Sequence, residues 1–299
     1  MTTLNWLYAA VVPGLQNLVD DAVAAALEKF APLNLHVDEL AVTLIDLRDP
    51  NNPDRAEYRG DAPVYPASIV KLFYLAAAHR QMEDGKISDT AELRRALHDM
   101  IVHSGNEATG YVLDVLTGTT SGPELPPAEL AAWGEKRDAV NRYFQSLGYT
   151  GVIASRKTWN DGPYGRDKQA VDQFNPAKNS LTSNATARLL VEIDSGKCVS
   201  AARSTQMLDL LKRDFADPSR ADHQACDFIG AGLPAGAQLW SKAGYMSVAR
   251  HDAALVEMPG GGKFALVIFT EQHSEAKEII PAIARQIVGG FETLNHVKC

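Results

Sequence analysis

Apolar residues recur at helical spacing near both ends of the chain, and strand-like runs lie just inside them. The pattern predicts an amphipathic helix over residues 14–31 and a closing helix over Ile279–Phe291. Clusters of Gly, Pro, Asn and Asp separate the strand-like runs. The predicted strands are Leu40–Leu47, Ala56–Arg59, Gln238–Tyr245, Asp252–Met258 and Phe264–Thr270.

The middle of the chain, from Ala67 to about Lys212, is predicted to be mostly helical, with apolar faces such as the one formed by Leu93, Leu97, Met100 and Ile101. Thr182 or Ser183 is predicted to cap one of these helices, because both hydroxyls precede an apolar periodic run. Two long segments, Thr117–Pro127 and Lys157–Ser180, interrupt the pattern and are predicted to be loops. Long loops inside a compact domain often form functional rims.

The order of elements is therefore helix, strands, a long helical insertion, more strands and a final helix. Such an order favours a sheet assembled from both chain ends, with a helical lobe inserted between them. We expect residues 1–66 and 236–299 to form the sheet-containing lobe, and residues 67–235 to form the helical lobe.

Composition and charge narrow the functional classes. Hydrophobic residues make up 45% and charged residues 22% of the 299 residues, which is typical of a globular protein. The net charge of −8 and the pI near 5.5 argue against a nucleic-acid partner, because phosphate binding needs a basic face. No apolar run reaches the ~20 residues of a membrane-spanning helix.

The apolar N-terminal stretch Met1–Leu15 lacks the positive start of a secretory signal. This leaves a mature secreted form and a cytoplasmic protein both open. Cys198, Cys226 and Cys299 are too few and too scattered for a disulfide framework or a Cys-based zinc site. A Cys198–Cys226 bridge is allowed by the spacing, and free thiols are the simpler interpretation. We expect no metal and no cofactor.

Candidate chemistry begins at the segment Tyr65–Phe73, which contains Ser68 and Lys71 three residues apart. After Pro66, the apolar run predicts a helix that starts near Ser68, so that both side chains share one face. A buried lysine has a lowered pKa and can accept the proton of the serine. The Ser-x-x-Lys pattern is common by itself, and a capping serine with a solvated lysine is the alternative.

Two further segments add weight to this pattern. Ser104 and Asn106 follow the end of an apolar helix, within His103-Ser104-Gly105-Asn106, where His103 itself is expected to be a polar or capping residue. Lys242 and Gly244 lie on a predicted inner strand, where a lysine is costly unless it has a function. The three patterns occur in order on a predicted helix, loop and strand. Gly-x-Ser-x-Gly, Walker-type and dinucleotide fingerprints are absent from the sequence.

Together the three segments resemble the Ser-x-x-Lys, Ser-Asp-Asn and Lys-Thr-Gly motifs of class A β-lactamases and penicillin-binding proteins. The resemblance covers nearly the whole chain. It implies an α/β (α+β) fold with an antiparallel sheet, flanking terminal helices and an inserted helical lobe, and an active site at the interface of the two lobes. It also implies a serine hydrolase that acts on a small-molecule or peptidoglycan-derived substrate, with a periplasmic or secreted location. We expect a monomer with no membrane span.

The resemblance assigns roles by position. Ser68 would attack the substrate carbonyl, Lys71 would help to deprotonate it, and Ser104 would relay a proton to the leaving nitrogen. Asn106 would hold Lys71 and the substrate amide. The expected substrate-binding residues are Lys242, Gly244, Tyr245 and Arg250, with the backbone N–H groups of Ser68 and Tyr245 forming an oxyanion hole. For Arg250 a surface strand position is the alternative, since its spacing from Lys242 differs from that of the family.

The sequence departs from the family pattern at three places. Gly105 replaces the usual Asp of the second motif, and Ala243 replaces the usual Thr of the third, which removes a substrate-facing hydroxyl. Class A enzymes carry a deacylating glutamate before the helix at Thr182, but Lys157–Ser180 contains no Glu. Its carboxylates are Asp161, Asp167 and Asp172, with Asn175 and Asn179 near its end.

Acylation is therefore supported by the motifs, whereas rapid deacylation is not. The favoured interpretation is a β-lactamase-like hydrolase that opens β-lactam or related amide and ester substrates through an acyl-Ser68 intermediate. A peptidase or esterase similar to penicillin-binding proteins, which also lack that glutamate, is the first alternative. A protein that binds an acyl ligand or a peptidoglycan fragment without turnover is the second.

Overall fold

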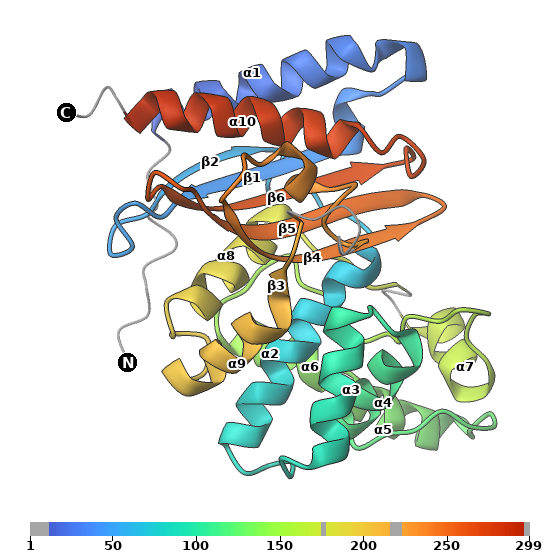
Figure 1. Cartoon of the computed structure of the whole chain (residues 1–299). Helices are drawn as coiled ribbons and strands as arrows, with labels where there is room; N and C mark the ends of the chain where they lie inside the picture. Colours follow the sequence, from blue (N-terminus) through green and yellow to red (C-terminus); the bar gives the residue numbers. More distant parts are fainter. Residues whose placement is uncertain (1–11, 175–177, 216–222, 296–299) are drawn as a thin grey trace.

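The chain is built around one sheet covered by helices on both faces (Figure 1). The computed structural model describes residues 12–174, 178–215 and 223–295. Within these residues, six antiparallel strands pair in the order β2-β1-β6-β5-β4-β3. Their bounds are β1 (Leu40–Asp46), β2 (Asp54–Tyr58), β3 (Lys212–Arg213), β4 (Gln238–Met246), β5 (Ala249–Glu257) and β6 (Lys263–Glu271).

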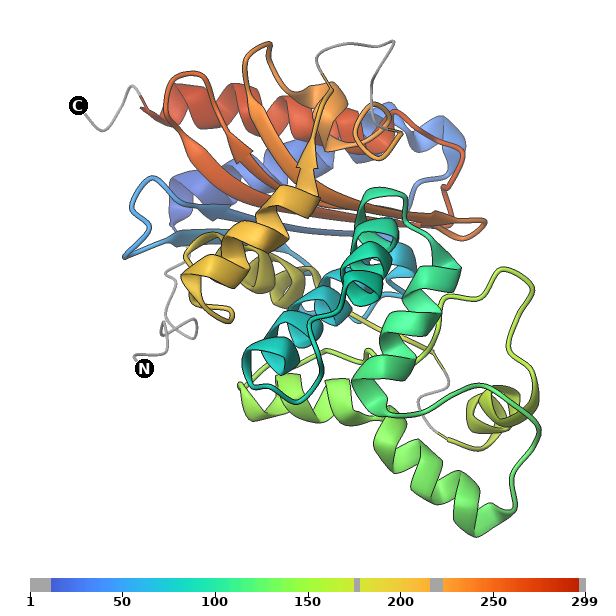
Figure 2. The same cartoon turned by 60° about the horizontal axis from the view of Figure 1, so that its bottom comes forward.

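Two terminal helices, α1 (Pro13–Lys29) and α10 (Ile279–Asn295), lie side by side on one face of the sheet (Figure 1). The remaining helices cover the other face, with α7 on the opposite side of this layer from α8 and α9 (Figures 1 and 2). Their bounds are α2 (Val70–Glu83), α3 (Ala91–Val102), α4 (Asn106–Thr117), α5 (Pro127–Arg137), α6 (Ala139–Ser146), α7 (Gly165–Gln173), α8 (Ser183–Asp194) and α9 (Ala201–Leu211). Short 3₁₀ turns are η2 (Ala31–Leu33), η3 (Val37–Glu39), η4 (Ala67–Ile69) and η5 (Ile229–Gly232).

The pleat of the strands divides the core in two. On β5, Ala253 and Leu255 pack with the inserted helices, whereas Ala254 and Val256 pack with α1 and α10. Successive side chains point to opposite faces of a sheet, so a strand covered on both sides is apolar throughout. This explains why residues 253–256 of β5 and residues 264–269 of β6 are continuous apolar runs rather than alternating ones.

The predicted α/β fold, with an antiparallel sheet made from both chain ends and an inserted helical layer, is confirmed. Thr182 is the N-cap of α8, since its hydroxyl accepts a hydrogen bond from the Ala185 N–H at 3.1 Å. The expectation that Lys157–Ser180 is a loop throughout was wrong, because it contains α7. Only Asp167 and Ala170 of that helix are buried, so its sequence lacks an apolar stripe.

Lys242 and Gly244 were predicted to lie on an inner strand, but β4 is internal only at its start. The two-residue β3 pairs with Leu239 and Trp240, and beyond them β4 has no further strand at that edge among the described residues. The η4 turn packs over β4 and β5 at the position of Gly244.

Other expectations concern the cysteines and membrane association. Cys198 is a buried free thiol, so it forms no bridge with Cys226. Residues 1–11 of the apolar N-terminal stretch, Asn175 and Cys299 lie outside the described residues. Among the residues that the structure describes, no helix is both long and apolar enough to cross a membrane.

Candidate active site

Ser68 lies in the η4 turn, between Pro66 and the start of α2, and its side chain is half-buried. The predicted helix start near Ser68 is therefore a 3₁₀ turn, and the α-helix itself begins at Val70. Ala67 has a φ of 45°, a left-handed conformation that costs a non-glycine residue about 1 kcal/mol. Such strained residues cluster at functional sites, where the surrounding structure holds them in place.

Lys71 occupies the first turn of α2 and is completely buried. Its ammonium group donates three hydrogen bonds, to the Ser104 carbonyl at 2.6 Å, the Ser104 hydroxyl at 3.1 Å and the Asn106 side-chain oxygen at 2.9 Å. Burial lowers the pKa of Lys71 to about 7, against the opposing effect of the Glu107 charge. The amine is thus poised to gain or lose a proton near neutral pH.

The second motif forms the turn between α3 and α4. Ser104 has a φ of 54°, and Asn106 is the first residue of α4. The Gly105 N–H donates to the Asp99 carbonyl at 2.9 Å, which closes the turn. The strained turn directs the Ser104 carbonyl and hydroxyl and the Asn106 amide toward the same lysine, so three of the predicted site residues are brought together.

The third motif lies on β4, where Gly244 is in close contact with the η4 turn that carries Ser68. A Cβ atom at this position would lie 2.9 Å from the Ser68 nitrogen and 3.0 Å from both the Ile69 nitrogen and the Pro66 oxygen. Only glycine permits this approach of two backbones. The Ser68 N–H therefore lies at the junction of η4 and β4, next to Tyr245, which follows Gly244.

Lys242 points to the helical face of the sheet and is fully buried. Its ammonium donates to the Gln224 side-chain oxygen and to the Ala243 carbonyl. Ala243 itself packs in the apolar core beneath α1 and α10. The resemblance to the family implied that the side chain at position 243 faces the substrate. In this structure the Ala243 side chain points to the opposite face of the sheet from Lys242.

Two buried residues that the sequence did not single out connect β4 to the end of α3. Arg213 donates to the Ser241 carbonyl at 3.0 Å and to the Ile101 carbonyl at 3.1 Å. Gln224 donates to the Val102 carbonyl at 2.7 Å as well as accepting from Lys242. These bonds fix the second motif relative to the third. Neither residue belongs to a motif, so only their tertiary contacts reveal them.

Arg250 lies on the sheet face that is covered by α1 and α10 and is 5% exposed. Its guanidinium stacks over the Phe228 ring at 4.2 Å and lies 5.9 Å from the Tyr245 ring. It donates to the main-chain carbonyls of Ser274 and Asp227. Tyr245 is 65% exposed, and its side chain lies on the same face of the sheet as Arg250. A carboxylate contact by Arg250 stays a prediction.

His251 contacts the segment that leads into the Ser68 turn, and the sequence did not single it out either. It is fully buried, with its Nε2 2.9 Å from the Tyr65 carbonyl, while its Nδ1 accepts from the Thr270 N–H. These partners place the proton on Nε2. Burial lowers the pKa of His251 to about 4, so the ring is neutral at pH 7 and anchors the segment that leads into Ser68.

The aspartates of the segment 157–180 differ in their surroundings. Asp167 is buried and pairs with Arg137 at 3.4 Å, and the exposed Asp172 pairs with Lys168 at 2.6 Å. Asp161 is exposed and lines the same cavity as Asn106. Of the three, Asp161 alone shares a cavity with a motif residue.

Asn160, which carries no charge, makes the direct contact between this segment and the second motif. Its side-chain oxygen accepts from the Asn106 amide at 2.6 Å, and its own amide donates to the Glu107 carboxylate at 2.5 Å. A continuous hydrogen-bond chain thus runs from Lys71 through Asn106 and Asn160 to Glu107. Glu107, immediately after the second motif, is the missed carboxylate of the site.

One group of possible metal ligands lies nearby. Among the described residues, His98, Asp99 and His103 bring one ligand atom each to within 4.8 Å of one another. Both histidines are exposed, and Asp99 is already paired with Arg95 at 3.0 Å. We assign this surface group no part in the reaction.

The comparisons with known proteins agree with this geometry. A family model described as "Beta-lactamase enzyme family" matches residues 22–94 and 89–291. No curated protein matches the sequence. Similar solved structures include a beta-lactamase from Sphaerobacter thermophilus, with 20% identity over 92% of this chain and 97% of that one and a TM-score of 0.66.

Two other similar structures were found. A variant of PBP-A, solved as an acyl-enzyme complex with penicillin G, is 19% identical over 93% of this chain and 97% of that one, with a TM-score of 0.67. A beta-lactamase from Chitinophaga pinensis is 19% identical over 92% of this chain and 99% of that one, with a TM-score of 0.66. At these identities the structural likeness establishes the fold.

Proposed function

This chain belongs to the beta-lactamase enzyme family of serine hydrolases, and from that premise we propose that it opens β-lactams or related amides and esters through an acyl-Ser68 intermediate. The main observation that supports this proposal is the environment of Lys71. A fully buried lysine with a pKa of about 7 lies one helical turn after Ser68 and is bound by both polar residues of the second motif. Such a lysine can act as a general base at neutral pH.

In the proposed acylation, the neutral Lys71 amine accepts the Ser68 proton while the Ser68 oxygen forms a bond to the substrate carbonyl carbon. The resulting oxyanion is held by the backbone N–H groups of Ser68 and Tyr245. The close approach of Gly244 to the Ser68 nitrogen supports this role. Preorganised donors of this kind typically contribute ~3–4 kcal/mol each to catalysis.

Collapse of the tetrahedral intermediate breaks the bond to the leaving nitrogen, which takes a proton from the Ser104 hydroxyl. Lys71 then returns its proton to Ser104, to which it is hydrogen-bonded at 3.1 Å. The products are an ester on Ser68 and a free amine, and both lysine and serine regain their starting states. Lys242 contributes positive potential for an anionic group of the substrate.

Deacylation is proposed to be slow. It needs a base that activates water, but the segment 157–180 has no glutamate, and two of its three aspartates are paired with Arg137 and Lys168. A peptidase or esterase with a long-lived acyl-enzyme is therefore the second candidate function. Asp161 and Glu107 are the remaining carboxylates near Asn106.

The test is intact-protein mass spectrometry over time after mixing with a chromogenic cephalosporin, with Ser68→Ala as the control. A transient adduct with accumulating product supports the β-lactamase activity. A persistent adduct without turnover supports the peptidase-like alternative. An unmodified wild-type protein at all times would contradict β-lactam recognition, and an adduct on Ser68→Ala would contradict the assigned nucleophile.

A further inference from the structure

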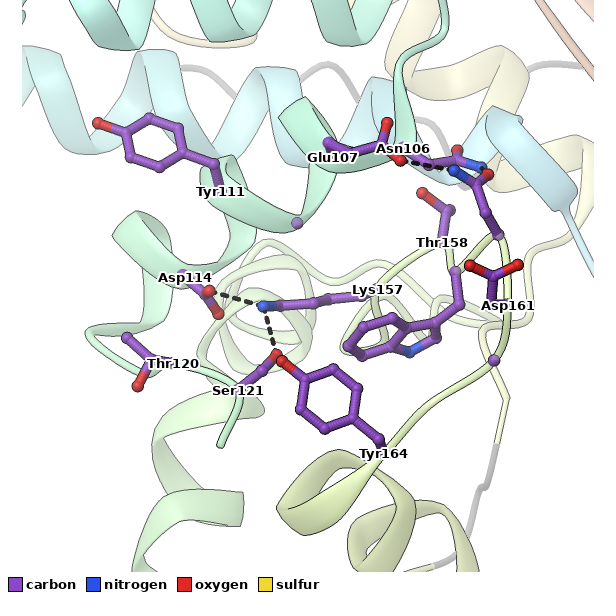
Figure 3. A pocket seen from close by; sticks show the side chains of 14 residues that line it. Asn106, Glu107, Tyr111, Asp114, Thr120, Ser121, Lys157, Thr158, Asp161 and Tyr164 are labelled. Atoms are coloured by element: carbon purple, nitrogen blue, oxygen red, sulfur yellow. Dashed lines mark hydrogen bonds and ion pairs between the residues drawn. The ribbon is translucent and has the colours of Figure 1, made fainter. Parts of the chain in front are cut away.

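A cavity of about 550 Å³ opens beside Asn106, between α4 and the segment 157–164 (Figure 3). Asn106, whose side chain binds Lys71, belongs to its lining, so the cavity borders the proposed site of acylation. The residues that line it are Asn106, Glu107, Gly110, Tyr111, Asp114, Thr120, Ser121, Lys157, Thr158, Trp159, Asn160, Asp161, Gly162 and Tyr164. Since Asn106 is proposed to hold the substrate amide, the cavity is placed to receive the acyl side chain beyond that amide.

The lining is acidic. It contains three carboxylates, Glu107, Asp114 and Asp161, and one cationic side chain, Lys157, which gives a formal charge of −2. Lys157 is not available to a ligand, because its ammonium is bound to Asp114 at 2.6 Å and to the Ser121 hydroxyl at 2.8 Å. Its side chain is only 9% exposed, and Figure 3 shows it extended along the cavity toward Asp114.

Neither of the two remaining carboxylates forms an ion pair within the described residues, although the Glu107 charge also acts on the buried Lys71. Asp161 is exposed and makes no ion pair or hydrogen bond within the described residues, and the exposed Glu107 accepts one hydrogen bond, from the neutral Asn160 amide. Both therefore present negative charge to a molecule in the cavity. An anionic side chain would be repelled there, and a cationic one attracted.

Aromatic rings form another part of the wall (Figure 3). Trp159 and Tyr164 pack edge to face with their centroids 5.6 Å apart, and Tyr164 is 58% exposed. The Trp159 ring already has the Lys157 ammonium 5.6 Å from its centroid, which shows that the ring is oriented to accept a cation. Thr158 adds a buried hydroxyl oxygen that has no hydrogen-bond partner. Aromatic faces combined with carboxylates suit an alkylammonium group, whose stem packs on the rings.

We propose that this cavity is a subsite for acyl side chains that carry a primary ammonium group on an apolar stem. The proposal rests on the proposed function, because it takes Ser68 as the acylated residue and Asn106 as the amide contact. It adds the chemical class of the preferred substrate. The subsite selects by charge during acylation, before any deacylating water is needed.

The test uses three amides of 6-aminopenicillanic acid that differ only at the tip of the side chain. Their acyl groups are 6-aminohexanoyl, which ends in an ammonium; heptanoyl, which ends in a methyl group in its place; and 6-carboxyhexanoyl, which ends in a carboxylate. The second-order rate of adduct formation on Ser68 is measured by intact mass at pH 7. We expect the ammonium compound to react about tenfold faster than the methyl compound, and the carboxylate compound to be the slowest.

The variant Asp161→Asn removes one carboxylate of the cavity, and Asp172→Asn is the matched control on the same segment, outside the cavity. Asp161→Asn should reduce the ammonium-to-methyl rate ratio about threefold, whereas Asp172→Asn should leave the ratio unchanged. Raising the salt concentration should also lower the ratio in the wild type, because exposed charges are screened.

The outcomes separate the two proposals. Equal rates for the three compounds, or the fastest reaction with the carboxylate, would overturn the ammonium subsite while leaving acyl-Ser68 chemistry intact. An unchanged ammonium-to-methyl rate ratio in Asp161→Asn would show that this cavity is not the source of the preference for the ammonium compound. A folded protein that forms no adduct with any compound would overturn the proposed function and the subsite with it.

Discussion

Asn106 has a buried side and an exposed side, and the two are built differently. On the buried side, Lys71 is inaccessible to water and is held by three acceptors from the α3–α4 turn. On the exposed side, the segment 157–164 contributes Asn160 and the exposed Asp161 around an open cavity. One set of polar groups is fixed by packing, and the other faces solvent.

The difference determines what each side can do. Burial shifts a protonation equilibrium and fixes geometry, which is what a general base requires. Solvent-facing charges act on whatever molecule approaches through solution, so they suit substrate selection. We therefore expect changes on the buried side to alter the rate of acylation strongly, and changes on the exposed side to alter it weakly or only for charged substrates.

The largest effect is expected for Lys71→Met, which keeps the length and volume of the side chain but removes the base. Acylation of Ser68 by a chromogenic cephalosporin should slow by about a thousandfold or more. The measurement is the rate of adduct formation by mass spectrometry, with thermal unfolding as a check that the variant is folded. Acylation within tenfold of the wild type would show that another group removes the Ser68 proton.

The pH dependence follows from the same lysine. The amine must be neutral to accept a proton, and the pKa of Lys71 is about 7. The second-order rate constant for acylation should be constant above pH 8 and fall about tenfold per pH unit below pH 6, so that it is about fiftyfold lower at pH 5 than at pH 7. A stopped-flow pH profile measures this. A rate that is flat between pH 5 and 8 would contradict the base role.

The next effect concerns the junction of η4 and β4. Gly244→Ala would place a methyl group 2.9 Å from the Ser68 nitrogen, so either the strand or the turn must move. We expect acylation to slow by about ten- to a hundredfold, since one oxyanion donor is worth about that much or more. Gly260→Ala is the control, because a Cβ atom there meets nothing within 4 Å. Equal acylation rates for the two variants would show that the contact between η4 and β4 has no part in acylation.

A smaller effect of opposite sign is expected for Glu107→Gln. The Glu107 carboxylate raises the pKa of Lys71, so its removal should lower that pKa and increase the neutral fraction at acid pH. At pH 6, acylation by a substrate without charge on its acyl side chain should become about twofold faster, with no change above pH 8. Glu129→Gln, on the exposed surface of α5, is the control. A slower reaction at pH 6 would indicate that Glu107 acts on the substrate rather than on Lys71.

Asp167→Asn should have the smallest effect on acylation, which we expect to change less than twofold. Asp167 is buried beside Arg137, whose guanidinium is 1% exposed, so the change should instead lower the free energy of unfolding by about 2 kcal/mol. Urea unfolding measures the loss, with Asp172→Asn as the surface control. A large loss of acylation without a loss of stability would indicate that Asp167 acts in the active site and not only in the core of the helical layer.

The sequence was sufficient for the elements whose pattern is local. The terminal helices, the five longer strands and the Thr182 cap were all recovered, because apolar spacing and capping hydroxyls depend on neighbours within a few residues. The helix α7 was missed, since only two of its residues are buried and its composition resembles a loop. Short pairings such as β3 leave no pattern of their own.

Within the candidate site, the three motifs named Ser68, Lys71, Ser104, Asn106 and Lys242 as expected site residues, and the resemblance that they carry led to the correct family. Their roles stay predictions. The contacts of Arg213, Gln224 and His251 could not be anticipated, because each joins segments that are distant in the chain. These residue types are common in any sequence, and only their positions in the folded chain connect them to the site.

The sequence by itself thus determined the family and the layered fold, and it named the candidate site residues that the proposal uses. The tertiary structure decided how deeply Lys71 is buried, where the Glu107 and Asp161 carboxylates face, and that Arg250 lies on the far side of the sheet from Lys242. The physical reason is that covalent order fixes which groups exist, whereas pKa values and charge recognition depend on desolvation and distance. Both of these are set by segments that meet only in the folded chain.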